Sequence, residues 1–268
     1  PYLEKNYYCD ASLEPVAYGS VSTEHSVMCS NFAVDGDEIT MLRRLLTELI
    51  HIPASLSLDS YDYWNLVDNI YRSSTMKSWR MTLPLIRGDS GNPVEIVTQT
   101  VYHLWEQFGG TINSKGYKVL DPHVKAIYGD SITIQRCEAI YKELEAHGFA
   151  ACNVHSASVA FHAMIEQDWY FETFTRDTFG MAVKANAGVI DGKEVNIFKD
   201  PKTDTDHFKK SLKGLCVVFD DQQDGRIRVQ DEMDQKTKEF YRSVDMLQPV
   251  FRNGKMMRRQ TLSASAIA

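Results

Sequence analysis

The sequence has no pair of cysteines at CxxC spacing, and its few cysteines are scattered. They are odd in number and stand at Cys9, Cys29, Cys137, Cys152 and Cys216. This pattern argues against a disulfide framework and against a zinc site, so we expect reduced thiols in a cytoplasmic protein. The chain also lacks an apolar run of about eighteen residues, which argues against a membrane-spanning helix.

Positive charge is also in short supply. There are 29 Lys and Arg residues against 36 Asp and Glu residues, which gives a net charge of -7. That balance argues against a general nucleic-acid binder, although a local basic pocket remains compatible with it. With 268 residues the chain can bury a large core, as one large domain or two small ones. It begins at Pro1 without a methionine, and we expect a piece of a longer protein with no secretory signal peptide.

Three short apolar segments are each followed by an Asp-Ser pair and then by a stretch with helical patterning. The segments are residues 55–58, 83–86 and 124–128, and the aspartates that follow them are Asp59, Asp89 and Asp130. Strand–helix alternation predicts a parallel sheet, and ligands bind at the carboxyl ends of such strands. We therefore expect the three aspartates to converge on one site.

The motif Arg87-Gly88-Asp89-Ser90-Gly91-Asn92-Pro93 carries most of the expected chemistry. A strand, a polar loop and a helix N-terminus follow one another here, and the exposed amides of such a terminus favour an anionic ligand. Asp89 is suited to hold a ribose hydroxyl or a metal ion, and Arg87 to bind a phosphate. The alternative is that each Asp-Ser pair only caps the next helix. Three pairs in succession, one with an arginine two residues before it, favour a shared site.

Other elements follow from apolar periodicity and from turn residues. We expect amphipathic helices from Ile39 to Leu49 and over residues 133–146, and a further helix over residues 94–108. The inward residues of the helix over 133–146 should be Ile134, Ala139, Ile140 and Leu144. Asp224-Gly225 and Asn253-Gly254 predict two β-hairpin turns.

Cationic side chains and one histidine are further candidates. His25 lies beside Glu24 at the expected end of a strand over residues 20–26, where it suits a catalytic base, a phosphate contact or a phosphoryl acceptor. A hydrogen-bonded structural histidine is the simpler alternative. Arg176 and Lys184 are spaced to flank one phosphate across a loop and a strand. The later lysines are interpreted as a solvated face, at Lys209, Lys210 and Lys213.

Several motifs, in order along nearly the whole chain, resemble those of the nicotinamide phosphoribosyltransferases, which join nicotinamide to phosphoribosyl pyrophosphate. They are Glu24-His25-Ser26, Asp59-Ser60-Tyr61-Asp62, Arg87 to Pro93, Asn113-Ser114-Lys115-Gly116-Tyr117-Lys118, Gly129-Asp130, Thr175-Arg176-Asp177, Phe198-Lys199-Asp200-Pro201 and Val250-Phe251-Arg252-Asn253-Gly254-Lys255. The resemblance implies an α/β fold, an irregular (β/α) barrel of the type II phosphoribosyltransferase kind, incomplete at the N-terminus, and a homodimer. We expect the barrel portion with the phosphoribosyl site over residues 1–214 and a β-rich extension over residues 215–268.

The resemblance also implies a role for each matching residue. Asp89 and Arg87 match a central pair, in which the aspartate holds the ribose hydroxyls and the arginine reaches the base or a phosphate. His25 matches a histidine that is phosphorylated when ATP hydrolysis is coupled to synthesis. The positions that line the ribosyl, pyrophosphate and phosphate sites are matched by Asp59, Gly129, Asp130, Arg176 and Lys184. Arg and Lys side chains together with Mg²⁺ would neutralise the departing pyrophosphate; the protein ligands of the metal stay open.

The chain departs from the family pattern in two respects. A glycine-rich phosphate loop is matched here by the stretch from Val154 to Ala160, which has no glycine, so we expect weaker phosphate binding. The N-terminal half of the family, with most of the base pocket, has no counterpart in these residues.

The expected activity is the formation of nicotinamide mononucleotide and pyrophosphate in NAD salvage. Two alternatives stay open: a relative that uses nicotinate, and a non-catalytic remnant that keeps a phosphate-binding site. A generic metal-dependent hydrolase would also use converging aspartates, but it would not need the set Arg87, Arg176 and Lys184.

Overall fold

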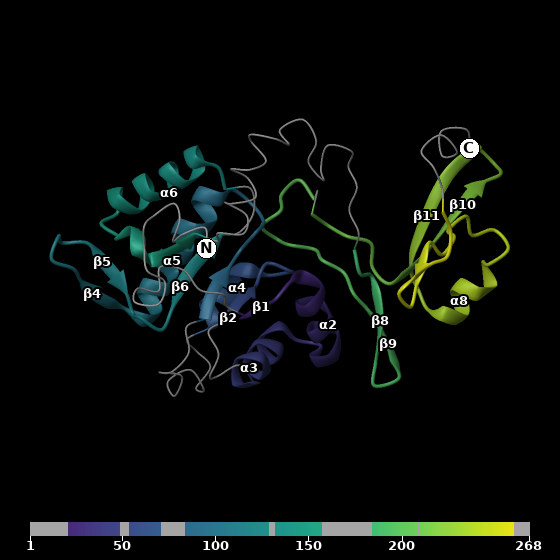
Figure 1. Ribbon diagram of the computed structural model, residues 1–268, viewed down its shortest axis with the longest axis horizontal. Helices are drawn as coiled ribbons and strands as arrows, with labels where there is room; N and C mark the ends of the chain where they lie inside the picture. The colour runs from purple at the N-terminus through teal and green to yellow at the C-terminus, as the bar shows by residue number, and fades with distance from the viewer. Residues whose placement is uncertain are drawn as a thin grey trace. The chain divides into compact units, whose positions relative to one another are not determined.

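A computed structural model describes residues 21–48, 54–70, 84–128, 132–156, 184–207 and 209–259 (Figure 1). The chain divides into two compact units, one made of residues 1–185 and 197–211, the other of residues 186–196 and 212–268. In the described residues, the first unit carries a parallel sheet with its helices, and the second carries antiparallel hairpins. No helix in the described part of the chain has the length and apolar character needed to cross a bilayer.

A five-stranded sheet in the order β1-β2-β3-β6-β7 organises the first unit. The bounds of these strands are Val21–Ser22, Ala54–Ser57, Pro84–Arg87, Lys125–Tyr128 and Val154–Ser156. All four pairings are parallel, and the register aligns Ser57 with Arg87 and Arg87 with Ile127. The strands therefore end together at one edge, and the predicted parallel α/β arrangement is confirmed.

The helices of the first unit are α2 (His25–Asp35), α3 (Glu38–Glu48), α4 (Tyr63–Asn69), α5 (Pro93–Phe108) and α6 (Ile134–Ala146), with a short 3-10 turn at Ala151–Asn153. The side chains of Asp62, Asn92 and Thr133 cap α4, α5 and α6 by accepting backbone N–H bonds. The caps therefore lie beyond the Asp-Ser pairs. Asp59 and Asp89 are therefore not the N-cap residues of α4 and α5. This excludes, for both aspartates, the alternative that the Asp-Ser pair only caps the next helix.

The core of the first unit lies where the helices cover the sheet. Leu56, Ile86 and Ala126 on neighbouring strands are fully buried and belong to one cluster with Leu66 of α4 and Val101 of α5. Burying each large apolar side chain stabilises the fold by about 1.5–3 kcal/mol. The amphipathic prediction for residues 39–49 is confirmed in α3, whose buried residues are Met41, Leu42, Leu45 and Leu46.

Two local predictions for the first unit were wrong. The expected strand over residues 20–26 ends at Ser22, and a helix begins at His25. Ile134 does not point inward: its side chain is 64% exposed. It begins α6 and lines a surface groove with Cys137 and Tyr141.

The polar segment from Asn113 to Lys118 is the turn of a hairpin, formed by β4 (Gly110–Ile112) and β5 (Lys118–Leu120). Asn113 stabilises this turn, because its side-chain oxygen accepts hydrogen bonds from the backbone N–H groups of Lys115 and Tyr117. A hairpin therefore precedes the third apolar strand.

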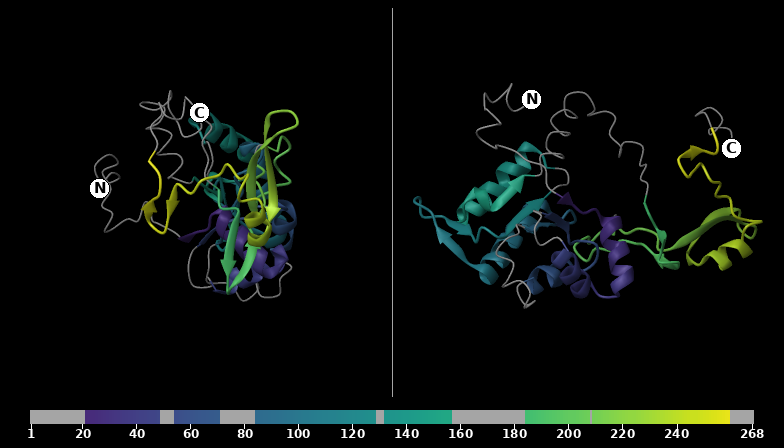
Figure 2. Two further views of the ribbon diagram at one scale, coloured as in Figure 1. Left: turned by 90° about the vertical axis from the view of Figure 1, so that its right-hand side faces the viewer. Right: turned by 60° about the horizontal axis from the view of Figure 1, so that its bottom comes forward.

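In its described residues, the second unit contains three antiparallel pairs, whose strands are coloured green to yellow in Figure 2. They are β8 (Ala187–Ile190) with β9 (Lys193–Asn196), β10 (Leu215–Asp221) with β11 (Arg226–Met233), and β12 (Phe251–Arg252) with β13 (Lys255–Met256), and α8 (Gln235–Phe240) packs on β10. Asn253 and Gly254 adopt positive φ, as the predicted Asn-Gly turn requires. Both predicted hairpins are confirmed.

Candidate functional site

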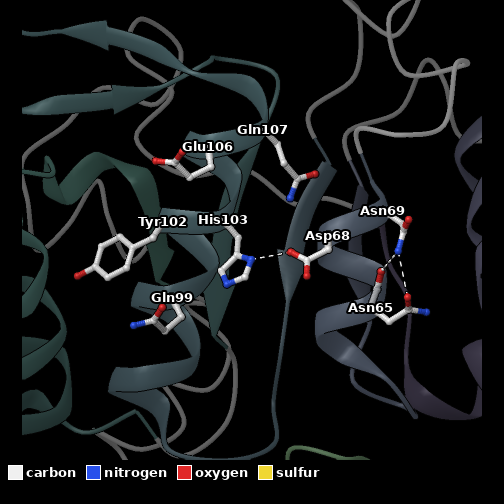
Figure 3. Close-up of a pocket in the computed structure, with 8 residues that line it drawn as sticks. All are labelled: Asn65, Asp68, Asn69, Gln99, Tyr102, His103, Glu106 and Gln107. Atoms are coloured by element: carbon white, nitrogen blue, oxygen red, sulfur yellow. Dashed lines mark hydrogen bonds and ion pairs between the residues drawn. The ribbon is translucent and has the colours of Figure 1, made fainter.

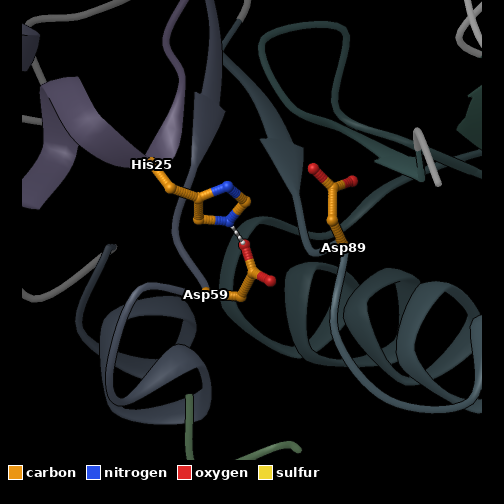
Figure 4. A group of neighbouring side chains, drawn as sticks. All are labelled: His25, Asp59 and Asp89. Carbon is orange, nitrogen blue, oxygen red and sulfur yellow. Dashed lines mark hydrogen bonds and ion pairs between the residues drawn. The ribbon is translucent and has the colours of Figure 1, made fainter. Parts of the chain in front are cut away.

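Four predicted site residues lie together where β1, β2 and β3 end; Figure 4 draws three of them, His25, Asp59 and Asp89. His25 begins α2, Asp59 follows β2, Arg87 ends β3, and Asp89 follows it. The ligand atoms of His25, Asp59 and Asp89 lie within 4.8 Å of one another. Figure 4 shows the imidazole bonded to Asp59, with the carboxylate of Asp89 on the neighbouring loop. Parallel pairing has brought two of the three Asp-Ser aspartates to one site.

Asp59 is the buried centre of the cluster. Its Oδ1 is 2.8 Å from His25 Nε2, and Ser90 Oγ donates a hydrogen bond to Oδ2 at 2.5 Å. Burial by itself would raise the pKa of this carboxyl, but His25 and the other donors hold it well below its usual range. Asp59 is therefore an anion, and because an anion only accepts, Nε2 of His25 is the protonated nitrogen.

Lys199 completes this group, and no role was predicted for it. Its ammonium donates to Asp59 Oδ2 at 3.3 Å, its Nζ lies 2.8 Å from His25 Nε2, and its side chain is only 12% exposed. Because the ammonium and the protonated Nε2 are both donors, the carboxylate of Asp59 is the acceptor that holds them together. Burial lowers the pKa of Lys199, whereas the negative charge of Asp59 opposes that shift. The cluster thus pairs a buried carboxylate with a buried cation, and it exposes part of the imidazole.

Arg87 is oriented by polar groups at the ends of β1 and β2. Its guanidinium donates to Ser22 Oγ at 2.8 Å, to the Thr23 carbonyl oxygen at 3.0 Å and to Ser57 Oγ. Its Nε lies 3.0 Å from Asp89 Oδ2. The arginine and the aspartate two residues later therefore form an ion pair.

Lys209 overturns one interpretation of the charged loop. Its ammonium donates to the backbone carbonyl oxygen of Asp89, and its side chain is half-buried rather than solvated. Lys210, by contrast, is exposed and pairs with Asp200 at 2.9 Å. A cation 120 residues away in sequence thus joins the Asp89 loop.

The structure explains why the motif has glycine at positions 88 and 91. A Cβ at Gly88 would meet Tyr63 and Ile96 at 2.9 Å, and Gly91 has a φ of +98°. Side chains are excluded at the first position by packing and at the second by backbone conformation. The loop therefore approaches α4 and α5 closely, which holds Asp89 and Ser90 at the strand end.

Of the remaining predicted positions, only Lys184 lies in the described part of the chain. Gly129, Asp130 and Arg176 lie outside the described residues. Lys184 is exposed and lies in no helix or strand. The stretch taken as a glycine-free loop begins with β7, and its residues 157–160 lie outside the described part.

A surface groove of about 680 Å³ runs between α4 and α5 (Figure 3). Its lining is polar, and none of its residues belongs to the cluster at the strand ends. His103 Nδ1 lies 2.6 Å from Asp68 Oδ1, and the same imidazole stacks on Trp64. These contacts link the two helices, so we assign them to packing.

The chain is similar to known phosphoribosyltransferases. Residues 22–255 match the Nicotinate phosphoribosyltransferase (NAPRTase) family. The Nicotinamide phosphoribosyltransferase of Acinetobacter baylyi is 35% identical, over 97% of this chain and 52% of its own length. The proteins of the same name from Xanthomonas campestris pv. campestris and Mycoplasma genitalium are each 34% identical, over 92% and 72% of this chain and over 51% and 43% of their own lengths. The chain spans about half the length of the curated relatives it matches. It belongs to the nicotinate phosphoribosyltransferase family.

Proposed function

We propose that this chain carries the phosphoribosyl part of the site of a nicotinamide phosphoribosyltransferase, which forms nicotinamide mononucleotide and pyrophosphate in NAD salvage. The names of the relatives support the substrate pair. The observation that carries the proposal is the cluster of Asp59, His25 and Lys199 beside the Arg87–Asp89 pair, at the carboxyl edge of a parallel sheet.

We further propose that the five strands are an arc of an irregular (β/α) barrel. Strands that follow one another along the chain are neighbours in the sheet, apart from the β4–β5 hairpin between β3 and β6. Successive parallel neighbours are the arrangement of barrels, in which active sites lie at the carboxyl ends. The homodimer implied by the sequence stays a prediction, and sedimentation equilibrium tests it.

The proposed reaction is a displacement at the anomeric carbon of the ribose. The bond from that carbon to a pyrophosphate oxygen breaks, and the ring nitrogen of nicotinamide forms the new bond. Positive charge develops on the ribosyl group, and the carboxylate of Asp89 stabilises it. Arg87, Lys199 and Lys209 supply cationic groups for the phosphates, which carry more negative charge as the bond breaks.

ATP coupling would use His25 as the phosphoryl acceptor. Asp59 accepts a hydrogen bond from the Nε2–H group, which leaves the lone pair on Nδ1 as the nucleophile. The terminal phosphoryl group of ATP would transfer to that nitrogen while ADP leaves. Lys199, at 2.8 Å from the imidazole, would offset part of the added negative charge.

The two aspartates also fit the Mg²⁺ that this proposal includes. Mg²⁺ prefers carboxylate oxygens and substrate phosphates, and Asp59 and Asp89 each offer an oxygen within 4.8 Å of the other. His25 belongs to the same group of atoms, but its nitrogen is a poorer partner for this ion. When bound, the ion would neutralise pyrophosphate. Each aspartate also faces a cation, Asp59 the ammonium of Lys199 and Asp89 the guanidinium of Arg87, so either carboxylate would share its charge with the ion.

Nicotinate is the second candidate base, because the family description names nicotinate whereas the relatives named above carry nicotinamide. The distinction is open to a direct competition assay. Equal amounts of the two bases would be offered with phosphoribosyl pyrophosphate, and the two mononucleotides separated by chromatography. Predominant nicotinamide mononucleotide supports the first assignment, and predominant nicotinate mononucleotide supports the second.

The proposed function is tested by Asp89→Ala. The variant should lose phosphoribosyl pyrophosphate binding and product formation, because it removes the carboxylate beside Arg87. Asp121→Ala is the matched control and should behave as wild type. Asp121 is a half-exposed aspartate that directly follows β5 and pairs with His123. Retained binding in the Asp89 variant would also support the alternative of a remnant whose phosphate site depends on other residues.

A further inference from the structure

Lys199 is held in one place although its segment has no regular secondary structure. It lies on residues 197–204, a segment that forms neither helix nor strand, yet its ammonium is held 2.8 Å from His25 and 3.3 Å from Asp59. A lysine side chain loses considerable conformational freedom when it is fixed in one place. Something other than secondary structure must therefore hold its backbone.

Tyr61 holds that backbone on both sides of Lys199. Its hydroxyl donates to the carbonyl oxygen of Phe198 at 2.9 Å, and the carbonyl oxygen of Tyr61 accepts from the N–H of Lys202 at 2.8 Å. The rings of Tyr61 and Phe198 pack edge to face, with their centroids 5.1 Å apart. The ring of Phe32 also packs against Tyr61, at a centroid distance of 4.4 Å. Tyr61 thus brackets the lysine with its side chain and its main chain.

The position of Tyr61 in sequence makes this bracket specific to the site. It follows Asp59 by two residues, on the same loop after β2. Ser60, between them, accepts from the N–H of Asp200 at 2.9 Å. One short loop therefore binds Lys199 at its ammonium, through Asp59, and along its backbone, through Ser60 and Tyr61.

We propose that Tyr61 is a positioning residue, whose hydroxyl bond to Phe198 sets the Lys199 ammonium against His25 and Asp59. This inference rests on the proposed function, in which Lys199 serves the phosphate-binding part of the site. In this role Tyr61 acts through the position of Lys199 and not on the substrate itself.

A double-mutant cycle tests this dependence. Tyr61→Phe removes only the hydroxyl, Lys199→Met removes the ammonium, and the double variant removes both. The dissociation constant for phosphoribosyl pyrophosphate with Mg²⁺ is measured by calorimetry on the 268-residue chain. Tyr117→Phe is the matched control, because its hydroxyl donates to the exposed Glu145 at 3.1 Å in the β4–β5 turn region.

Tyr61→Phe should weaken binding roughly three- to tenfold, the usual effect of one hydrogen bond. In the Lys199→Met background it should cause no further loss, since the group that it positions is gone. Tyr117→Phe should match wild type. Equal losses from Tyr61→Phe in both backgrounds would overturn the inference and would leave the proposed function standing.

A second readout works without any substrate. Hydrogen–deuterium exchange followed by mass spectrometry reports how firmly the backbone N–H groups of Asp200 and Lys202 are held by the carbonyl oxygens of Ser60 and Tyr61. Tyr61→Phe should raise exchange at these two amides, because the segment loses its bond at Phe198. Unchanged exchange at both amides would refute the positioning role. Absence of substrate binding by the wild-type chain, together with raised exchange in the variant, would instead count against the proposed function alone.

Discussion

Replacing Asp59 with asparagine is the sharpest test of how the cluster is held together. The substitution keeps the shape of the side chain but removes the charge that faces Lys199 and His25. Asp59 is fully buried and Lys199 is 12% exposed, so the ammonium would lose its nearest counter-charge in a poorly solvated place. Removing one member of a buried ion pair costs about 3–5 kcal/mol. We expect about 3 kcal/mol, at the low end of that range, because Asp89 still attracts the ammonium.

Urea unfolding followed by circular dichroism measures this loss. Asp68→Asn is the matched control, because Asp68 also pairs with a histidine, at 2.6 Å, but has a side chain that is 50% exposed. Such an exposed pair contributes less than about 1 kcal/mol. Equal losses of unfolding free energy in the two variants would refute the claim that Asp59 forms a buried ion pair with a charged Lys199.

The same prediction has a pH dependence. The pKa of Asp59 is held below its ordinary value of 3.8 in the folded protein. A depressed pKa stabilises the fold above the ordinary value, and that stabilisation is lost as the pH falls through the folded-state pKa. The difference between wild type and Asp59→Asn should therefore shrink in acid. A difference that stays constant from neutral pH to about pH 2 would contradict this linkage.

Three further predictions address other parts of the first unit. Burial raises the pKa of Glu38 from 4.5 to about 7, so the stability that it contributes is present below about pH 4.5 and is lost as the pH rises through about 7. Glu38→Gln should remove a fall in unfolding free energy of the order of 1 kcal/mol across that window in urea titrations, whereas an unchanged slope would show that Glu38 does not titrate there. His25→Ala should abolish ATP stimulation but keep slow basal turnover in a chromatographic product assay; a full ATP response in the variant would exclude phosphoryl transfer to His25. Lys209→Met should weaken pyrophosphate binding in calorimetry, and Lys142→Met, on the exposed face of α6, should not; equal affinities in both variants would remove Lys209 from the site.

Local patterns predicted the elements whose signals are local. The Leu stripe of α3 reports burial against one side, and the strands before Asp59 and Asp89 are short apolar runs between polar turns. The Asn-Gly turn predicted its hairpin because φ is positive at both residues. Alternation of these elements then sufficed for a parallel sheet.

The helix α2 escaped prediction because its signals are weak. Its N-cap residue, Glu24, makes no side-chain capping bond, and only Met28 and Cys29 of the helix are buried. A chain with so little apolar periodicity resembles the irregular end of a strand. This error affects the site, because His25 lies at the start of a helix and not at the end of a strand.

Lys199 and Lys209 escaped prediction for a different reason. Lys199 lies 140 residues from Asp59, and Lys209 lies 120 residues from Asp89. No local spacing encodes such pairs, and a loop rich in lysine is more often solvated. The aspartates were predictable because each follows its own strand, whereas their partners depend on how a distant segment folds back over the strand ends.

Isothermal titration of the chain with phosphoribosyl pyrophosphate and Mg²⁺, with and without nicotinamide, tests the central proposal most directly. Saturable binding in the micromolar range is the expected result, because the cluster of Arg87, Asp89 and Lys199 supplies both charges that the ligand needs. Asp89→Ala on the same instrument should remove the heat of binding. A folded chain, judged by circular dichroism, that gives no heat with this ligand would contradict the proposal that the strand-end cluster is a phosphoribosyl site.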